Sequence, residues 1–179
     1  GKKGLGMLAL SIGEPTRLGG AFNMYREALK EAEPVGDFVN DKCAAFTLGL
    51  CGDDNHEARQ LAAEAAKWYY GLNREFARDF ASDWGSASNV PESYKYYAHL
   101  AEKGVDIKST IYPLTPDEMA DQAMIVTGDP ESCIRAVKRY EETGADELII
   151  CMQMGNIPHD KIMRSIELFG SEIIPKFQS

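Results

Sequence analysis

The sequence predicts an α/β fold built on a parallel sheet, and three observations lead to this prediction. Short apolar segments alternate with amphipathic helical patterns along the chain. The apolar segments are nearly continuous, as expected of strands that are buried on both faces of a sheet. Between one apolar segment and the next there is room for a helix, which a crossover between parallel strands requires.

The first strand–helix unit occupies about the first 36 residues. Residues 5–11 form a short apolar run that predicts the first strand. Pro34 and Gly36 are expected to end the helix that follows. Its core-facing positions recur at intervals of three and four residues: Leu18, Phe22, Tyr25, Leu29 and Ala32.

The second unit begins with residues 43–51, which are again apolar and end in a Gly-Asp-Asp-Asn turn. A long helix is expected next, with Asp54 or Asn55 as its N-cap and Glu57 in its first turn. One face of this helix carries the apolar positions Ala58, Leu61, Ala65, Trp68, Leu72, Phe76 and Phe80.

Residues 82–126 form a long connection with several glycines, serines and prolines. A connection of this length is uncommon in a compact domain unless it has a function, such as that of a lid or binding loop. A structured surface excursion is the equally weighted alternative. Tyr94, Tyr96 and Tyr97 are the candidate functional residues of this segment, although aromatic side chains here also fit simple packing.

The third unit begins at Asp129 and Pro130, an N-cap followed by proline at the first helical position. Gly144 is expected to end this helix, and residues 147–153 predict the third strand. A last helix is expected over residues 159–169. Its predicted inward positions are Ile162, Ile166 and Phe169.

Composition excludes several classes of protein. The chain has 179 residues, 44% of them hydrophobic and 26% charged, as is typical of one globular domain. A net charge of −9 argues against a nucleic-acid or anionic-membrane partner. No apolar run approaches the length of a membrane span. The cysteines form no CxxC pair and the histidines no zinc-binding spacing, so we expect reduced thiols, a cytoplasmic protein and no metal site.

Three parallel strands would leave two bare sheet edges, which is an aggregation hazard. We therefore expect the chain to be part of a larger α/β domain. The first predicted strand begins within a few residues of Gly1, and the chain has no initiating methionine. These two observations lead us to expect the missing part on the N-terminal side.

Three motifs near the end of the chain carry a family resemblance. Residues 128–131 read Gly-Asp-Pro-Glu, residues 144–148 read Gly-Ala-Asp-Glu-Leu, and residues 164–169 read Arg-Ser-Ile-Glu-Leu-Phe, with Ile174-Pro175 behind. In this order and spacing they resemble the C-terminus of the bacterial-luciferase-like, flavin-dependent monooxygenases. The first strand, Tyr25-Arg26 and Trp68-Tyr69 also fit the order of that family.

The resemblance implies a (β/α)8 TIM barrel in which residues 1–179 supply about the last three strands and their helices. Residues 82–126 would be the excursion after strand seven. Chemistry in such barrels occurs at the carboxyl ends of the strands. This selects Leu10 and Ser11 after strand six, which would line the isoalloxazine, Cys51 after strand seven, and Gln153 and Met154 after strand eight.

The resemblance also implies an activity: oxidation of a hydrophobic small molecule by O2 and reduced FMN, with the flavin reduced by a separate reductase. The protein then supplies orientation and a dry pocket. Cys51 and the three tyrosines named above are the candidate substrate or lid residues. The catalytic residues and the main phosphate loop would lie upstream of Gly1. Asn156, before the last helix, is a secondary phosphate candidate, for which an ordinary turn is the more frequent explanation.

Two other functions remain open. A deazaflavin (F420)-dependent oxidoreductase of the same superfamily would share this part of the fold. A flavin-binding barrel protein without catalysis is the other possibility. The expected partners are the N-terminal part of the barrel, a flavin reductase and a small hydrophobic substrate, and the complete protein is expected to be a homo-oligomer.

Overall fold

The computed structural model describes residues 1–11, 13–83 and 111–177, and it describes residues 72–83 by their backbone alone. Tyr94, Tyr96 and Tyr97 lie outside these ranges. No helix in the described part is both long and apolar enough to cross a membrane.

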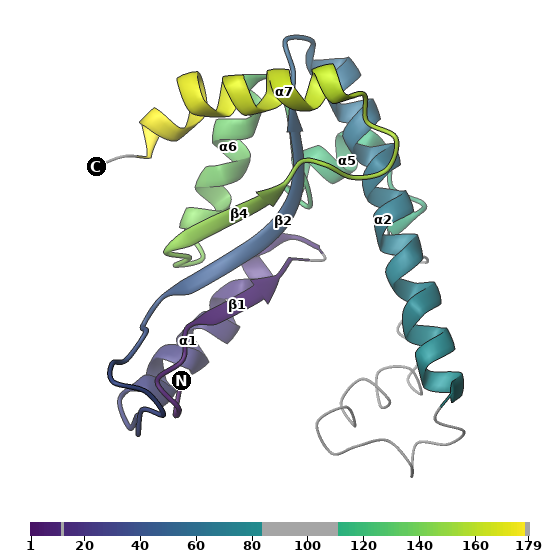
Figure 1. Cartoon of the computed structure of the whole chain (residues 1–179). Coiled ribbons are helices and arrows are strands. Elements are labelled where there is room, and N and C mark those ends of the chain that lie inside the picture. Colours follow the sequence, from purple (N-terminus) through teal and green to yellow (C-terminus); the bar gives the residue numbers. More distant parts are fainter. Residues whose placement is uncertain (12, 84–110, 178–179) are drawn as a thin grey trace.

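Within the described residues, four parallel strands form the sheet: β1 (Met7–Leu10), β2 (Cys43–Cys51), β3 (Val126–Gly128) and β4 (Glu147–Cys151). The long strand β2 lies in the centre, with β1 and β4 beside its first half and β3 beside its last three residues (Figure 1). Met7 is aligned with Cys43, and Ala44 with Glu147. The three predicted strands and their parallel order are therefore confirmed, whereas β3 was not predicted.

Helices α2 (Asn55–Asp83), α5 (Pro116–Asp121) and α6 (Pro130–Glu141) begin where polar side chains bond their first N–H groups. Before α2, the Asp54 carboxylate accepts the backbone N–H of Glu57 at 2.7 Å. Asp129 does the same for α6 by accepting from Ser132 at 2.8 Å. Both caps were predicted. The unpredicted α5 begins in a capping box between Thr115 and Glu118.

Helix α1 (Leu18–Leu29) follows a short 3-10 turn at Pro15–Arg17. Helix α7 (His159–Leu168) agrees with the helix predicted over residues 159–169, and a π-helical turn over Phe169–Ile173 continues its path. Gly170 has open space around it, so nothing forces the chain to turn there.

Two core layers lie on opposite faces of the sheet. The first packs α1, α6 and α7 against side chains such as Phe22, Cys43 and Tyr140. The second packs α2 and α5 against Leu48 and Leu50, near the carboxyl end of β2. Because side chains alternate along a strand, Cys43, Ala45 and Cys51 of β2 face the first layer, and Leu48 and Leu50 face the second.

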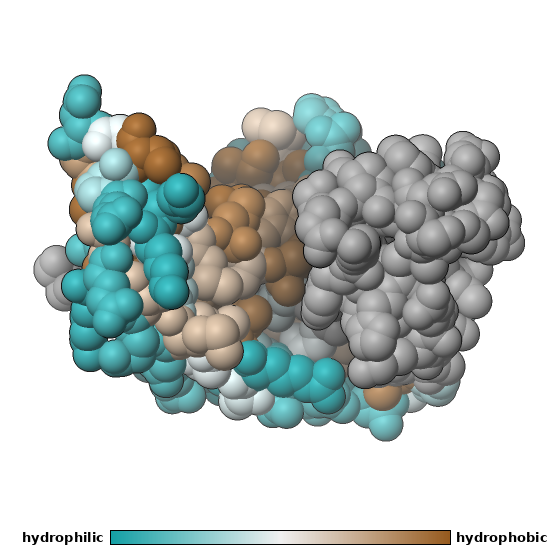
Figure 2. All heavy atoms as spheres, turned by 90° about the horizontal axis from the view of Figure 1, so that it is seen from below, coloured by the Kyte–Doolittle hydropathy of each residue, from teal (hydrophilic) through white to brown (hydrophobic). Residues whose placement is uncertain are grey.

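The second face of the sheet is open where α2 does not reach it. Leu8 is 62% exposed, Leu10 48% and Ile149 44%. In the space-filling view, hydrophobic residues gather in the middle of the molecular surface (Figure 2). The prediction of strands buried on both faces is therefore wrong for this part of the sheet, because within the described chain only one layer of helices covers it.

Two other predicted core positions, Trp68 and Ile166, are also exposed, as is Ile174 of the C-terminal segment. On α2 the covered face consists of small residues, among them Ala62, Ala63 and Ala66. Close packing against alanine brings that face nearest to the sheet and turns the bulky indole outward. Ile166 and Ile174 lie on the side of the C-terminal helical segment that faces away from the first core layer.

Asp146 joins three segments at the amino ends of the strands. Its carboxylate accepts the backbone N–H of Cys43 at 2.7 Å and lies 3.3 Å from the Arg26 guanidinium. Arg26 also donates to the carbonyl oxygen of Gly144. The starts of β2 and β4 are thereby tied to α1.

Candidate functional site

The carboxyl ends of β1, β2 and β4 point to the same edge of the sheet, because the strands are parallel. This edge is where (β/α)8 barrels carry their chemistry. Of the residues predicted to line it, Leu10 lies half exposed on the open face, and Gln153 and Asn156 are exposed. Ser11 and Met154 are each 3% exposed, and their side chains are covered by protein.

Ser11 belongs to a buried polar network. Its Oγ lies 3.2 Å from the hydroxyl of Tyr140, and its carbonyl accepts from the hydroxyl of Tyr70 at 3.3 Å. Tyr140 also lies 2.9 Å from Thr47 Oγ1 and donates to the carbonyl of Ala123 at 2.9 Å. Since Tyr140 belongs to the layer under α6, the Ser11 hydroxyl is directed away from the open face, where Leu10 lies.

Burial raises the pKa of both Tyr140 and Tyr70 above the ordinary value of a tyrosine. Both phenols therefore stay neutral at physiological pH and serve as hydrogen-bond partners. The network joins the end of β1 to α2 and α6, so it fixes the position of Leu10.

We expect Tyr140→Phe to destabilise the protein by about 1–2 kcal/mol, because it leaves the Ala123 carbonyl without its buried donor. Thr47→Val should destabilise the Tyr140→Phe variant less than it destabilises the wild type. The difference between the two losses, about 1 kcal/mol, is the coupling energy of the two hydroxyls. Chemical denaturation of the two single variants and the double variant measures this coupling. Additive effects would show that the two hydroxyls do not act together.

Cys51 is buried and cannot meet a ligand at the surface. Its backbone N–H donates to Ser165 Oγ at 2.9 Å. Contact with the Cys51 thiol, together with burial, raises the pKa of Cys133 well above its usual range. Buried free cysteines such as these two pack as small apolar side chains, which is the ordinary role of free cysteine in a core.

Several charged groups at this end of the sheet are already paired. Arg164 binds Asp53 at 2.7 Å, and this hydrogen bond lowers the pKa of the Asp53 carboxyl. Lys161 pairs with Glu57 at 2.6 Å. By contrast, Arg17, in the turn after β1, is exposed and forms no ion pair in the part of the chain that the structure describes. The described ranges contain no cluster of His, Cys, Asp and Glu that could hold a metal ion.

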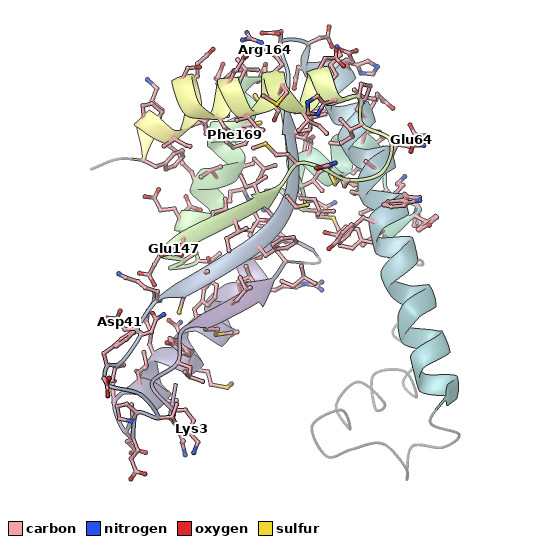
Figure 3. The ribbon with its side chains drawn as sticks, in the orientation of Figure 1. Lys3, Asp41, Glu64, Glu147, Arg164 and Phe169 are labelled. Carbon is pink, nitrogen blue, oxygen red and sulfur yellow. The ribbon has the colours of Figure 1, made fainter. Side chains whose placement is uncertain are left out.

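A cleft of about 140 Å³ lies between α2 and the loop from β4 to α7. Glu64 and Trp68 of α2 and Asn156 of the loop line it, and Glu64 stands beside this loop in the side-chain view (Figure 3). Sequence reasoning had placed Asn156 near a ligand but had assigned Trp68 to the core and had passed over Glu64 and Arg17. The closeness of Asn156 to α2 could not be read from local patterns, because the two segments are far apart in sequence.

No protein-family model and no curated protein matches this sequence. Solved structures do match. The monooxygenase RslO1 from Streptomyces bottropensis is 15% identical, with a TM-score of 0.61 over 99% of this chain and 43% of its own. The F420-dependent tetrahydromethanopterin reductase from Methanopyrus kandleri is 21% identical, with a TM-score of 0.55 over 97% of this chain and 45% of its own.

A third match is the oxygenating constituent of 3,6-diketocamphane monooxygenase from Pseudomonas putida, a type II Baeyer–Villiger monooxygenase in complex with FMN. It is 15% identical, with a TM-score of 0.50 over 96% of this chain and 48% of its own. The chain thus spans less than half the length of the structures it resembles. These likenesses confirm the predicted fold: part of a TIM barrel of the luciferase-like type.

Proposed function

We propose that this chain, which has the fold of part of a luciferase-like TIM barrel, is the C-terminal part of an oxidoreductase that uses reduced FMN and O2 to oxidise a hydrophobic small molecule. The open apolar face of the sheet, which ends at the half-exposed Leu10, carries the proposal. In a closed barrel this face lines the interior, and its carboxyl end lies where barrel enzymes bind ligands. Two structures of the same fold are named as monooxygenases.

The residues on the open face fit a flat, largely apolar ring system. Leu8, Leu10 and Ile149 are exposed there, and Phe46 is half-buried beside them. Glu147, which carries a charge on the same face, lies at the amino end of β4, away from the proposed binding end (Figure 3). Apolar side chains of this kind can hold an isoalloxazine and keep water out.

A bound flavin would carry out the reaction with O2. The protein would orient the flavin and the substrate and keep water out of the site. Leu10 would contact the ring, while the buried hydroxyls of Ser11, Thr47 and Tyr140 hold the end of β1 in place. The phosphate would be held mainly by residues outside this chain. Arg17 is the exposed cation after β1 that could add a positive charge at this end.

The proposed partners follow from the same arrangement. β1 and β4 each pair only with β2 among the described strands, so their outer edges are available to further barrel strands. We propose that the N-terminal part of the same barrel pairs with them, and that a separate reductase supplies the reduced flavin. The four cysteines are free thiols, which supports a cytoplasmic location.

The test uses the complete barrel protein that contains this chain, titrated separately with FMN and with F420. We expect preferential binding of FMN and, with the flavin reduced and O2 present, transfer of labelled oxygen into a hydrophobic product. Absorbance of the cofactor, O2 consumption and mass spectrometry of the product give the three readouts. Binding of neither cofactor would reject the proposal.

The second candidate is an F420-dependent oxidoreductase. One observation favours it: the reductase from Methanopyrus kandleri has the highest sequence identity among the three structures described above. Preference for F420, with hydride transfer and no oxygen incorporation, would replace the first proposal by this one. Flavin binding without turnover of any tested substrate would instead support a barrel protein that only binds the cofactor.

A further inference from the structure

The cleft between α2 and the β4–α7 loop has a lining unlike that of the open sheet face. Its apolar floor is formed by Leu61, Ala65 and Ile157. Its charged and amide lining residues are Glu64 and Asn156. No lysine or arginine lines it among the described residues. A cleft with one carboxylate and no cation repels a phosphate and attracts a positively charged group.

Glu64 lacks the ion pair that its helix would normally provide. Lys67 stands three residues further along α2, a spacing at which opposite charges usually meet. The Lys67 ammonium is directed elsewhere and donates to the carbonyl oxygen of Leu114 at 2.6 Å. Within the described ranges Glu64 has neither an ion pair nor a hydrogen bond, so its charge remains available to a ligand.

Trp68 supplies an aromatic surface next to this charge. It lies four residues after Glu64 and therefore on the same face of α2. Its side chain is 52% exposed although it lines the cleft. The faces of indole rings attract organic cations, and quaternary ammonium groups are recognised by aromatic walls of this kind.

The two sides of the cleft are held at a fixed separation. Gly155 has a positive φ of 54°, and a Cβ placed on it would lie 3.1 Å from the Cβ of Ala65. The loop is thus seated directly on α2 at a position where both residues must be small. This contact keeps Asn156 opposite Glu64 and Trp68 without help from a ligand.

We propose that this cleft binds a compact alkylammonium group, with Trp68 against its methyl groups and Glu64 balancing its charge. A volume of about 140 Å³ suits a group the size of trimethylammonium rather than a whole cofactor. The overall charge of −9 also favours cations over anions near this surface. The site is separate from the flavin proposal and does not depend on it.

Choline tests the proposal without any flavin present. In a Trp84→Phe variant of residues 1–179 alone, Trp68 is the only tryptophan, so its fluorescence reports directly on the cleft. We expect a saturable change in emission with choline. The neutral analogue of choline, 3,3-dimethylbutan-1-ol, carries a tert-butyl group in place of trimethylammonium. It should bind at least about threefold more weakly than choline, because cation–π and charge attraction are both lost.

Glu64→Gln is expected to weaken choline binding about threefold to fivefold, and Trp68→Leu, measured by calorimetry, by a similar factor. Glu27→Gln on α1 removes the same charge from a remote exposed position and should leave the affinity unchanged. Calorimetry on the unmodified chain checks that Trp84→Phe has not altered the site. Equal binding of the neutral alcohol, no saturable binding, or an unchanged affinity in Glu64→Gln would each overturn the proposal.

Discussion

Gly49→Val is expected to destabilise the protein by about 3 kcal/mol or more, although valine is favoured in strands. A Cβ on Gly49 would lie 2.5 Å from the carbonyl oxygen of Val126 and 2.8 Å from a methyl group of Ile150. The nearer atom belongs to the backbone of β3 and cannot move without loss of the pairing between β2 and β3. Thermal denaturation followed by circular dichroism should show a fall in Tm of about 10 °C.

Gly20→Ala is the matched control, because it adds the same Cβ inside α1 where nothing lies within 4 Å. Alanine is the better helix former, so we expect a gain of about 0.5–1 kcal/mol and a small rise in Tm. If Gly49→Val were as stable as the wild type, the close approach of β3 to β2 would be incorrect. A loss of stability in both variants would indicate a general sensitivity to substitution.

Leu10→Asp is expected to raise the dissociation constant for FMN in the complete barrel protein by about tenfold to a hundredfold. In the proposed site Leu10 contacts the flavin ring, and a carboxylate placed there loses its water when the ring binds. Because this face lines the interior of the closed barrel, the substitution should also lower the free energy of unfolding of the complete protein, by about 1–3 kcal/mol. Fluorescence titration measures the affinity, and chemical denaturation measures the stability.

Met24→Asp introduces the same charge on the outer surface of α1, where Met24 is exposed. FMN affinity should stay at the wild-type value in this variant. Equal weakening in the two variants would point to the overall negative charge rather than to contact at Leu10. Unchanged affinity in Leu10→Asp would remove this residue from the flavin site, whether or not the protein binds flavin.

Local patterns predicted those parts of the fold that depend on neighbouring residues. The caps at Asp54 and Asp129 act over three residues, and the strand at 43–51 is a continuous apolar run, so each could be read directly. Strand β3 was missed because it has only three residues and its place depends on Gly49, which is distant in sequence. No period of two can be recognised in so short a segment.

Whether an apolar side chain is exposed depends on which surfaces pack together, and local sequence patterns do not show which surfaces those are. Trp68 fits an apolar stripe on α2, yet the sheet packs against the alanines beside it. Leu8 and Leu10 look like core residues because apolar content does not show whether a second layer covers them. Among the predicted site residues, Leu10, Gln153 and Asn156 are accessible. The direction of the Ser11 hydroxyl follows from Tyr140, which is 129 residues away in the chain.

The interactions around Asp146 stabilise one end of the sheet, and the proposed ligand site lies at the other end. They secure the amino ends of β2 and β4 through Cys43, Arg26 and Gly144, and no residue of the opposite loops takes part. Loops at the carboxyl ends can therefore be exchanged or lengthened without loosening this anchor. A laboratory that wishes to alter ligand preference should vary the exposed Gln153 and Asn156 and leave Asp146 and the closely packed Gly155 untouched.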